Sequence, residues 1–382
     1  MRFGTKLLHS EKTIDKNTGS VTLPIYQSST FHQFDIDNFG EYDYARSGNP
    51  TRNSLEEEFA SLEGGKFAYA FSSGIAAISS VISTFSAGDH LVVAEDVYGG
   101  TYRAVTKLFN RFNIEFTFVD ASKIENIEKA IKENTKAIYL ETPSNPLLKI
   151  TDLKEAVDLA KKYDLVTIVD NTFMSPYLQR PLELGIDIVV HSATKFIGGH
   201  SDVIAGFAVT NNRVLSDEIY RIQNGFGAIL SPQDCYLVSR GLKTLKVRMN
   251  QSQKNALELS KWLLEQDLVE EVYYPGIESH QDYEIHKKQS FGPGAVLSFK
   301  FKNIEQTKYF LNNVENVVVA VSLGAVETIV SYPVKMSHAA IPREERQRLG
   351  ITDTLIRVSL GIEDIEDIIE GFKKGFLNNY SN

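Results

Sequence analysis

The sequence predicts an α/β protein in which a mostly parallel seven-stranded sheet lies between helices, followed by a smaller C-terminal α+β domain. Two observations indicate this fold class. Short β-rich runs alternate with longer helical segments from about residue 67 to residue 211, and several runs are apolar on successive residues. Continuous apolar runs are typical of parallel strands buried on both faces. Helices between such strands predict βα units that cover both sides of the sheet.

Residues 1–50 come first, and their scattered polar and aromatic side chains show no regular period, so we expect an extended arm. A large domain is expected over residues 51–235. Its strands are predicted at residues 67–73, 90–95, 115–120, 137–142, 166–171, 187–194 and 204–211.

The order of elements changes beyond about residue 235, which predicts a second domain over residues 236–382. A long helical stretch comes first, and strands are expected at residues 295–301, 317–323 and 355–360. The chain closes on a predicted amphipathic helix. Its apolar residues at helical spacing are Ile362, Ile365, Ile369, Phe372 and Phe376. Acidic residues lead this helix and lysines follow, which suits the helix dipole.

Composition narrows the function. The formal net charge of −9, with no run of five basic residues, argues against a nucleic-acid partner. No apolar stretch approaches the length of a membrane span, and no secretory signal is expected. The single cysteine, Cys235, rules out an internal disulfide and fits a reducing cytoplasm. We therefore expect a cytoplasmic enzyme.

The common nucleotide and metal motifs do not occur. The stretch NGFGAI lacks the third glycine of a dinucleotide-binding loop, and LEGGKF lacks the spacing and hydroxyl residue of a P-loop. The eight histidines and one cysteine show no metal-ligand spacing, so no metal is expected.

Three predicted strand ends carry complementary polar residues instead. Ser73, Gly74 and Ile75 open a helix whose free N–H groups suit a phosphate, although an ordinary turn glycine is the alternative. Asp170 ends an apolar strand, where a buried acid needs a cation unless it caps a helix. Lys195 follows another strand among small residues, where a surface lysine is the default alternative.

The three features together describe one ligand. The carboxyl ends of parallel strands meet at one edge of a sheet, where ligands bind. A phosphate, a ring nitrogen that stays protonated and an aldehyde are the parts of pyridoxal 5'-phosphate (PLP). A lysine forms an imine with its aldehyde, an acid pairs with its ring nitrogen, and a helix N-terminus holds its phosphate.

The chain resembles, over essentially its whole length, the Cys/Met-metabolism PLP-dependent enzymes, which have the aspartate-aminotransferase-like fold type I. This family includes cystathionine γ-synthases, cystathionine β- and γ-lyases and methionine γ-lyases. The resemblance rests on YARSGNPTR (44–52), FSSGIAA (71–77), DVYGGTYR (96–103), ETPSNP (141–146), VDNTF (169–173), HSATKFIGGHSD (191–202), QNGFGAILSPQD (223–234), RGLKTLKVRM (240–249), AVSLGAVETIVSYP (320–333) and IRVSLGIED (356–364).

The resemblance implies a role for each matching residue. Lys195 matches the lysine that carries the cofactor, Asp170 the acid at the ring nitrogen, and Tyr98 the tyrosine stacked on the ring. The other implied contacts are a phosphate cradle of Gly74, Ile75, Ser192 and Thr194, a phosphate-binding pair from a neighbouring subunit, Tyr44 and Arg46, and a substrate α-carboxylate site of Asn145, Ser322 and Arg357. A homotetramer built as a dimer of dimers is implied, with the arm contacting the neighbouring subunit and each active site shared across a dimer.

Within this family, the sequence of residues 29–52, 227–235 and 320–342 most resembles that of the bacterial MetC-type cystathionine β-lyases. Val321 stands where γ-acting relatives often carry a glutamate for the distal ammonium of the substrate, and Gly100 stands where methionine γ-lyases typically carry a cysteine. The resemblance therefore implies cleavage of L-cystathionine to homocysteine, pyruvate and ammonia, a step of methionine biosynthesis and transsulfuration.

Three alternatives stay open. The first is cystathionine γ-lyase or homocysteine γ-lyase chemistry, and the second is O-acylhomoserine sulfhydrylase or cystathionine γ-synthase chemistry. The third is a PLP-binding regulatory protein that no longer turns over. The intact set of Lys195, Asp170 and Arg357 argues against this last reading.

Overall fold

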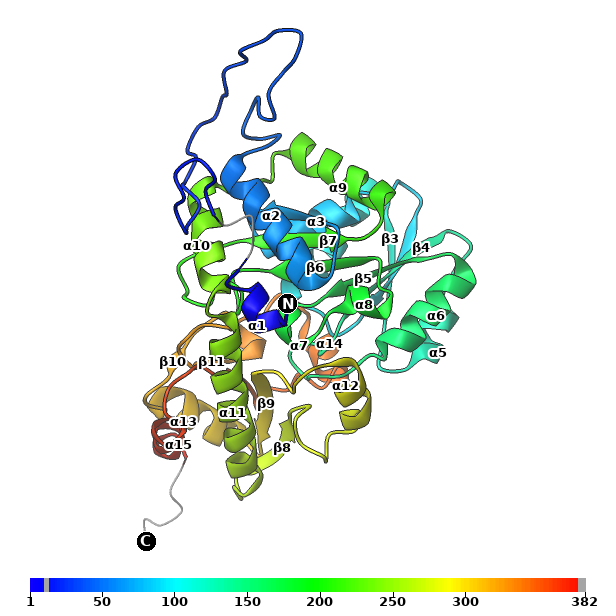
Figure 1. Cartoon of the computed structure of the whole chain (residues 1–382). Helices are drawn as coiled ribbons and strands as arrows, with labels where there is room; N and C mark the ends of the chain where they lie inside the picture. The colour runs from blue at the N-terminus through cyan, green and yellow to red at the C-terminus, as the bar shows by residue number, and fades with distance from the viewer. Residues whose placement is uncertain (10–13, 377–382) are drawn as a thin grey trace.

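Two sheets of unequal size organise the chain (Figure 1). The structure is a computed structural model that describes residues 1–9 and 14–376. The larger sheet has seven strands and lies between helices, and the smaller has five strands and comes from the C-terminal part of the chain. This is the α/β fold that the sequence predicts.

The larger sheet has the strand order β1-β7-β6-β5-β4-β2-β3, and each strand overlaps one of the seven predicted runs. Neighbouring strands are parallel except at β7, which is antiparallel to both β1 and β6. The strands are β1 (Phe67–Phe71), β2 (His90–Ala94), β3 (Glu115–Val119), β4 (Thr135–Glu141), β5 (Val166–Asp170), β6 (Ile188–Ser192) and β7 (Gly206–Thr210). The carboxyl ends of β1, β2, β4, β5 and β6 therefore meet at one edge.

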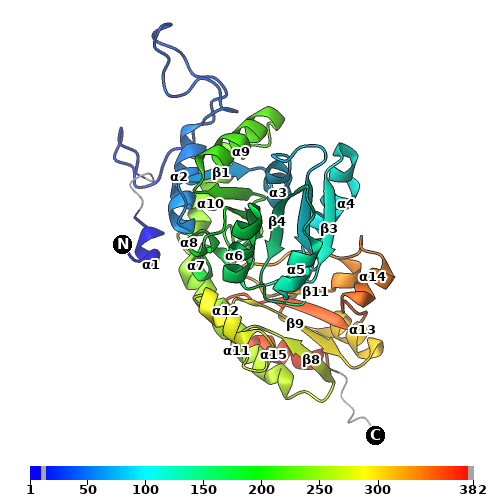
Figure 2. The same cartoon turned by 90° about the vertical axis from the view of Figure 1, so that its right-hand side faces the viewer.

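Helices cover both faces of this sheet (Figure 2). One face carries α2 (Pro50–Glu63), α5 (Ile124–Ala130), α6 (Leu153–Tyr163) and α8 (Pro181–Leu184), and the other carries α3 (Gly74–Ile82), α4 (Gly99–Lys107) and α9 (Arg213–Phe226). The remaining elements of this part are α7 (Ser175–Leu178), α10 (Pro232–Leu242) and a short 3-10 helix, Phe109–Phe112.

Helix α2 shows how local sequence sets these boundaries. The side-chain oxygen of Asn49 accepts hydrogen bonds from the N–H groups of Thr51 and Arg52, at 3.0 and 3.3 Å. Pro50 occupies the first helical position, where its missing N–H costs nothing. The helix ends at Gly64, whose φ of +76° is a left-handed conformation that glycine adopts without strain.

The smaller sheet has the order β10-β11-β12-β9-β8, and only β10 and β11 pair in parallel. Its elements are β8 (Val269–Tyr273), α12 (Tyr283–Gln289), β9 (Val296–Phe301), α13 (Ile304–Asn313), β10 (Val318–Val319), β11 (Ile329–Ser331), a 3-10 helix (Pro333–Lys335), α14 (Arg343–Arg348), β12 (Leu355–Ser359) and α15 (Ile365–Lys374). Strands β8 and β11 were not predicted, because β8 contains two glutamates and β11 is only three residues long.

The prediction of a strand over 317–323 is wrong for most of its length, since only Val318–Val319 is strand. The chain leaves the extended conformation at Ser322, where φ is +86°, and at Gly324, where φ is +79°. These turns carry Ser322 away from the small sheet and toward the edge of the large one.

The C-terminal helix also differs from its prediction. It begins at Ile365, so Ile362 precedes it and is 42% exposed. The buried apolar residue of the first turn is Ile368, which packs with Phe372 and Phe376 against the small sheet. The predicted apolar face was therefore displaced at its N-terminal end.

Helix α11 (Leu245–Leu264) connects the two parts of the chain. Its first half contributes Met249 to the hydrophobic core of the large sheet, and its second half contributes Leu259 to the core of the small sheet. The domain limits at 51–235 and 236–382 stay predictions, and the last six residues of the second range lie outside the described residues.

Where the structure describes the N-terminal arm, it is irregular apart from one helical turn, α1 (Phe3–Lys6), and an isolated bridge between Thr30 and Tyr44. A long loop before α2 projects from the body of the molecule (Figure 1). It exposes Phe34, Ile36 and Phe39, which are 93%, 78% and 58% accessible. Exposed apolar side chains gathered on one segment are typical of a surface that meets another protein. Among the described helices, none is long and apolar enough to cross a membrane.

Candidate active site

A cavity of about 420 Å³ lies at the carboxyl edge of the large sheet, within the usual size range of ligand sites. Both parts of the chain line it. The sequence-predicted residues among its walls are Gly74, Ile75, Tyr98, Asn145, Asp170, Ser192, Thr194, Lys195, Val321, Ser322 and Arg357. Residues far apart in the sequence are thus brought together, and only Tyr44 and Arg46 of the predicted set lie elsewhere.

Lys195 lies in the connection from β6 to β7, and its Nζ donates a hydrogen bond to Ser322 Oγ at 2.6 Å. Burial, together with the positive charge of Arg357, lowers the pKa of Lys195 to about 8, while Asp170 acts in the opposite direction. A larger fraction of this amine is therefore neutral near pH 7 than for a surface lysine. The neutral amine is the nucleophilic form.

Asp170 ends β5 and is almost completely buried. Its Oδ1 accepts hydrogen bonds from the backbone N–H and the hydroxyl of Thr172, at 3.0 and 2.5 Å. Burial raises the pKa of Asp170, although both Thr172 bonds oppose the rise. Within the described residues, no donor contacts the other oxygen, Oδ2. The carboxylate is thus ready to pair with a cation that enters the cavity.

The turn from β1 into α3 packs directly against the end of β6 and lines the cavity with it. The Ser73 hydroxyl caps α3 by accepting a hydrogen bond from Ala76 N at 3.1 Å. A Cβ on Gly74 would lie only 2.6 Å from the Cβ of Ser192, so this position admits only glycine. The close approach places the first N–H groups of α3 beside the Ser192 side chain, which is the donor arrangement that suits a phosphate.

Arg357 projects from the middle of β12 and is buried. Its guanidinium donates to Asn145 Oδ1 at 3.0 Å, to the Ser322 carbonyl at 2.6 Å and to Ser331 Oγ at 3.1 Å. Its Nε is buried without a partner among the described residues. An orphaned donor of a planar guanidinium at a cavity wall is a chemically sound binding point for a carboxylate.

Tyr98 immediately precedes α4, and its side chain is 40% exposed at the cavity. A Cβ on Gly100 would lie 2.2 Å from the Tyr98 ring, so only glycine at this position avoids a clash with the ring. The Tyr98 N–H donates to Glu141 Oε2 at 2.7 Å.

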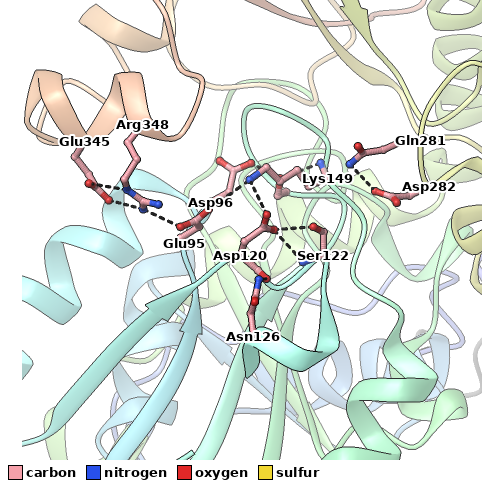
Figure 3. A network of polar contacts seen from close by, with 11 residues as sticks. Glu95, Asp96, Asp120, Ser122, Asn126, Lys149, Gln281, Asp282, Glu345 and Arg348 are labelled. Carbon is pink, nitrogen blue, oxygen red and sulfur yellow. Dashed lines mark hydrogen bonds and ion pairs between the residues drawn. The ribbon is translucent and has the colours of Figure 1, made fainter. Parts of the chain in front are cut away.

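Figure 3 shows a charged network that includes Glu95 and Asp96, which follow β2 and precede Tyr98 in the chain. Lys149 lies between Glu95 and Asp120, at 3.4 and 3.7 Å, and Arg348 joins Glu95 to Glu345 of α14 at 2.7 Å on each side. The loop after β2 is therefore tied to the loop after β4 and to the C-terminal part of the chain.

Sequence reasoning missed three residues of the cavity region. Glu141 lines the cavity and ends β4, and its position after an apolar strand is the same signal that identified Asp170. Arg103 of α4 lines the mouth, and its guanidinium has no ion-pair partner among the described residues. His338 contacts the carbonyl of Asn145 at 3.0 Å. Burial and the charge of Arg357 lower its pKa to about 4, so the ring is neutral.

Tyr44 and Arg46 lie on the arm, away from the cavity of their own chain. Arg46 donates to the carbonyl of Asn224 at 2.8 Å, and its guanidinium lies 5.6 Å from the Tyr44 ring centre. Their predicted contact with a neighbouring subunit stays a prediction.

The model of the family described as Cys/Met metabolism PLP-dependent enzyme matches residues 4–377. The chain belongs to this family. The chain is 53% identical over 370 residues to the cystathionine beta-lyase MetC of Bacillus subtilis (strain 168). The aligned residues cover 97% of this chain and 95% of that protein.

Other members of the Cys/Met metabolism family are nearly as similar. The cystathionine gamma-lyase of Bacillus subtilis (strain 168) is 50% identical over 378 residues, covering 99% of this chain and all of that protein. The crystal structure of cystathionine gamma-lyase from Lactobacillus plantarum complexed with L-serine superposes with a TM-score of 0.96 at 45% identity, covering 98% of both chains.

The residues that line the cavity of this chain provide the contacts that PLP, the cofactor of this family, requires. The N-terminus of α3 beside Ser192 and Thr194 would hold the phosphate of PLP, the free oxygen of Asp170 would pair with the ring nitrogen, and Lys195 offers an amine with a lowered pKa. No group of three or more metal-ligating side chains occurs among residues 1–9 and 14–376.

The lowered pKa of Lys195 leads to a prediction about cofactor loading. We expect the rate of covalent PLP attachment to cofactor-free protein to rise with pH and to level off above about pH 8. The fraction of Lys195 in the neutral form increases as the pH rises. Below the pKa of about 8, the rate should therefore fall by about tenfold for each pH unit. The measurement is the growth of visible absorbance after mixing with PLP. A plateau reached only near pH ~10.4, the value of a surface lysine, would show that the cavity does not shift this amine.

Proposed function

We propose that the chain is a cystathionine β-lyase, which cleaves L-cystathionine to homocysteine, pyruvate and ammonia. The observation that carries the proposal is the meeting of the Lys195 amine, the Asp170 carboxylate and the Arg357 guanidinium in one cavity. The similarity to the Bacillus subtilis cystathionine beta-lyase MetC over nearly the full length of both chains supports it.

When bound, PLP supplies the electron sink that makes the Cα proton of an attached amino acid removable. Arg357 would hold the substrate α-carboxylate through its guanidinium, with Asn145 keeping that group in place. The Lys195 amine, free once the substrate amine has taken its place on the cofactor, would then face the Cα–H bond and take the proton at Nζ. The C–S bond at Cβ then breaks and homocysteine leaves. The remaining three-carbon enamine reacts with water to give pyruvate and ammonia.

Incubation of the purified protein with L-cystathionine tests the proposal. We expect pyruvate as the main keto acid, together with homocysteine and ammonia. Formation of 2-oxobutyrate and cysteine instead would make the enzyme a cystathionine γ-lyase. That second candidate is supported by the 50% identity to the Bacillus subtilis cystathionine gamma-lyase and by the Lactobacillus plantarum structure. With neither keto acid, the proposal fails.

Val321 favours β- over γ-cleavage in this proposal. Its side chain is 63% exposed, lines the cavity and directly precedes Ser322. A glutamate at this place would attract the distal ammonium of cystathionine bound for γ-cleavage, whereas valine offers no charge. Arg103 at the mouth would attract the distal carboxylate in either orientation.

Replacement of Val321 by glutamate is therefore expected to raise 2-oxobutyrate relative to pyruvate by several-fold. An exposed ion pair contributes only about 0.2–1 kcal/mol, and closer packing of the substrate would increase it. Both keto acids are measured in one cystathionine reaction. Val321→Gln is the matched control, because glutamine has the same size as glutamate but no charge. An unchanged ratio in Val321→Glu would place the choice of orientation at other residues.

We also propose a cytoplasmic homotetramer in which the arm reaches the active site of a neighbouring subunit. The exposed apolar residues of the arm and the position of Tyr44 and Arg46 outside their own cavity support this arrangement. The buried, unpaired Cys235 fits a reducing compartment.

Complementation tests the shared site. Arg46→Ala should weaken PLP binding by about 1.5–3 kcal/mol, the value of a hydrogen bond to a charged group. Arg46→Ala and Lys195→Ala proteins, mixed and allowed to exchange subunits, should regain part of the activity, because one hybrid site then contains two unmutated halves. If exchange is demonstrated by labelled subunits and no activity returns, the sites are not shared.

A further inference from the structure

Glu141 is a second buried acid beside Asp170. It forms no ion pair within residues 1–9 and 14–376, although the charge of Arg357 acts to lower its pKa. Glu141 ends β4 and Asp170 ends β5, and the two residues are register partners in the parallel pair. Side chains of such partners point to the same face of a sheet, about 5 Å apart. Both are 5% exposed, and both line the cavity. One ring nitrogen can pair with only one of them.

The hydrogen bonds assign different charges to the two acids. Asp170 accepts two bonds from Thr172, which stabilise its ionised form. Glu141 accepts one bond, from Tyr98 N, and burial together with the charge of Asp170 raises the pKa of Glu141 well above its usual value. Two neighbouring carboxyl groups avoid double ionisation by sharing one proton. The proton of this pair therefore belongs to Glu141, and the negative charge belongs to Asp170.

Glu141 contacts segment 98–100, which directly follows the loop that carries Glu95 and Asp96 of the network in Figure 3. Tyr98 is the N-cap residue of α4, yet its side chain makes no capping bond and is free for the cavity. Gly99 and Gly100 follow and are closely packed, because a Cβ on Gly99 would lie 2.0 Å from the Ser337 carbonyl oxygen and a Cβ on Gly100 would lie 2.2 Å from the Tyr98 ring. Among the described residues, Glu141 is the one side chain that hydrogen-bonds to segment 98–100. A residue 43 positions away thus holds the start of α4 in place.

We propose that Glu141 is the positioning residue for Tyr98: its carboxyl oxygen anchors the backbone N–H at the start of α4 and thereby holds the phenol ring over the cofactor site. This inference rests on the proposed place of Tyr98 beside PLP. A neutral side-chain acceptor of the same length is sufficient for the role, because the bond uses a single oxygen and the acid is uncharged.

The first test compares Glu141→Gln with Glu141→Leu. The visible circular dichroism of bound PLP reports how the ring next to the cofactor is oriented, and PLP affinity and kcat/KM for cystathionine are measured beside it. Glu141→Gln keeps the acceptor, so we expect all three within about threefold of the wild type. Glu141→Leu leaves a buried N–H without a partner, so kcat/KM should fall about 10–100-fold, with an altered dichroic band. A glutamine variant as impaired as the leucine variant would overturn the inference.

A double-mutant cycle with Tyr98→Ala separates positioning from general damage. If Glu141 acts through Tyr98, Glu141→Leu should change kcat/KM and the dichroic band by less than about threefold once the ring is gone. Independent, multiplicative effects would overturn the inference. Glu58→Gln is the matched control, because Glu58 is another buried acid with a pKa raised to about 7 and lies on α2, where its hydrogen-bond partner is Ser239. It should leave the dichroic band unchanged.

Two further comparisons keep the test decisive. If Glu141→Leu does not fold, Glu141→Asp takes its place, since a carboxyl group one methylene shorter loses the 2.7 Å contact and should alter the band. An aspartate variant like the wild type beside an impaired glutamine variant would mean that the charge matters, which contradicts the inference. Failure of the proposed function gives a different result. The wild type would then form 2-oxobutyrate in place of pyruvate, or neither keto acid, while the double-mutant cycle read by the dichroism of bound PLP would still measure the Glu141–Tyr98 coupling.

Discussion

Replacement of Lys195 by alanine should abolish the visible absorbance of covalently held PLP and nearly all turnover of cystathionine. A general acid–base group contributes roughly 10²–10⁴-fold to a rate. The expected loss exceeds this range, because in the proposed mechanism the same amine also forms the covalent link to the cofactor. The environment of Lys195 fits both tasks: the amine is held 2.6 Å from Ser322 Oγ inside the cavity, with a pKa lowered to about 8.

Borohydride reduction followed by peptide mapping checks the attachment directly. In the wild type, the cofactor mass should be fixed to the peptide that contains Lys195. Lys149→Ala is the matched control, because Lys149 is another partly buried lysine, in the loop after β4, but is paired with Glu95 and Asp120. That variant should still carry the label on Lys195. A label on any other lysine, or full turnover by Lys195→Ala, would contradict the assignment.

The fold was predictable because its strands carry their own signal. The runs around Val92, Ile138 and Val189 are apolar on successive residues, and all three side chains are buried in the large sheet. The small sheet was predicted less well. Strand β11 is three residues long, and the segment around Ser322 was predicted as strand although its positive φ turns it toward the cavity. Such a turn is fixed by the contacts with Lys195 and Arg357, which no local pattern reveals.

The cavity residues were predictable where a reactive or charged side chain lies at or just after the end of an apolar strand. Asp170 ends β5 and Lys195 closely follows β6, and the two parallel strands bring both residues to the same cavity. Glu141 carries the same signal, since it also ends an apolar strand, but within its motif ETPSNP the family resemblance implies a role only for Asn145. Arg103 gives no such signal, since an arginine on the surface of a helix is common. The arm is a different case, because a single chain contains only half of the arrangement that Tyr44 and Arg46 are predicted to form.

Replacement of Arg357 by leucine should have the second large effect. Loss of two hydrogen bonds to a substrate carboxylate, each worth about 1.5–3 kcal/mol when one partner is charged, corresponds to a fall in kcat/KM of roughly 10²–10⁴-fold. Arg357→Lys keeps the charge but loses the planar two-point contact, so an intermediate loss is expected. Steady-state kinetics with cystathionine measures both variants, and thermal unfolding controls for the buried contacts with Asn145 and Ser331.

The same pair of variants has a second, independent readout at Lys195. The positive charge of Arg357 disfavours the ammonium form of Lys195 and so contributes to its lowered pKa. Removing that charge should raise the pKa, and the pH at which covalent PLP loading levels off should move upward from about 8 in Arg357→Leu. Arg357→Lys retains the charge and should leave this midpoint nearly unchanged, although its kcat/KM falls. A midpoint that moves equally in both variants would mean that the guanidinium contacts, and not the charge, control the Lys195 amine.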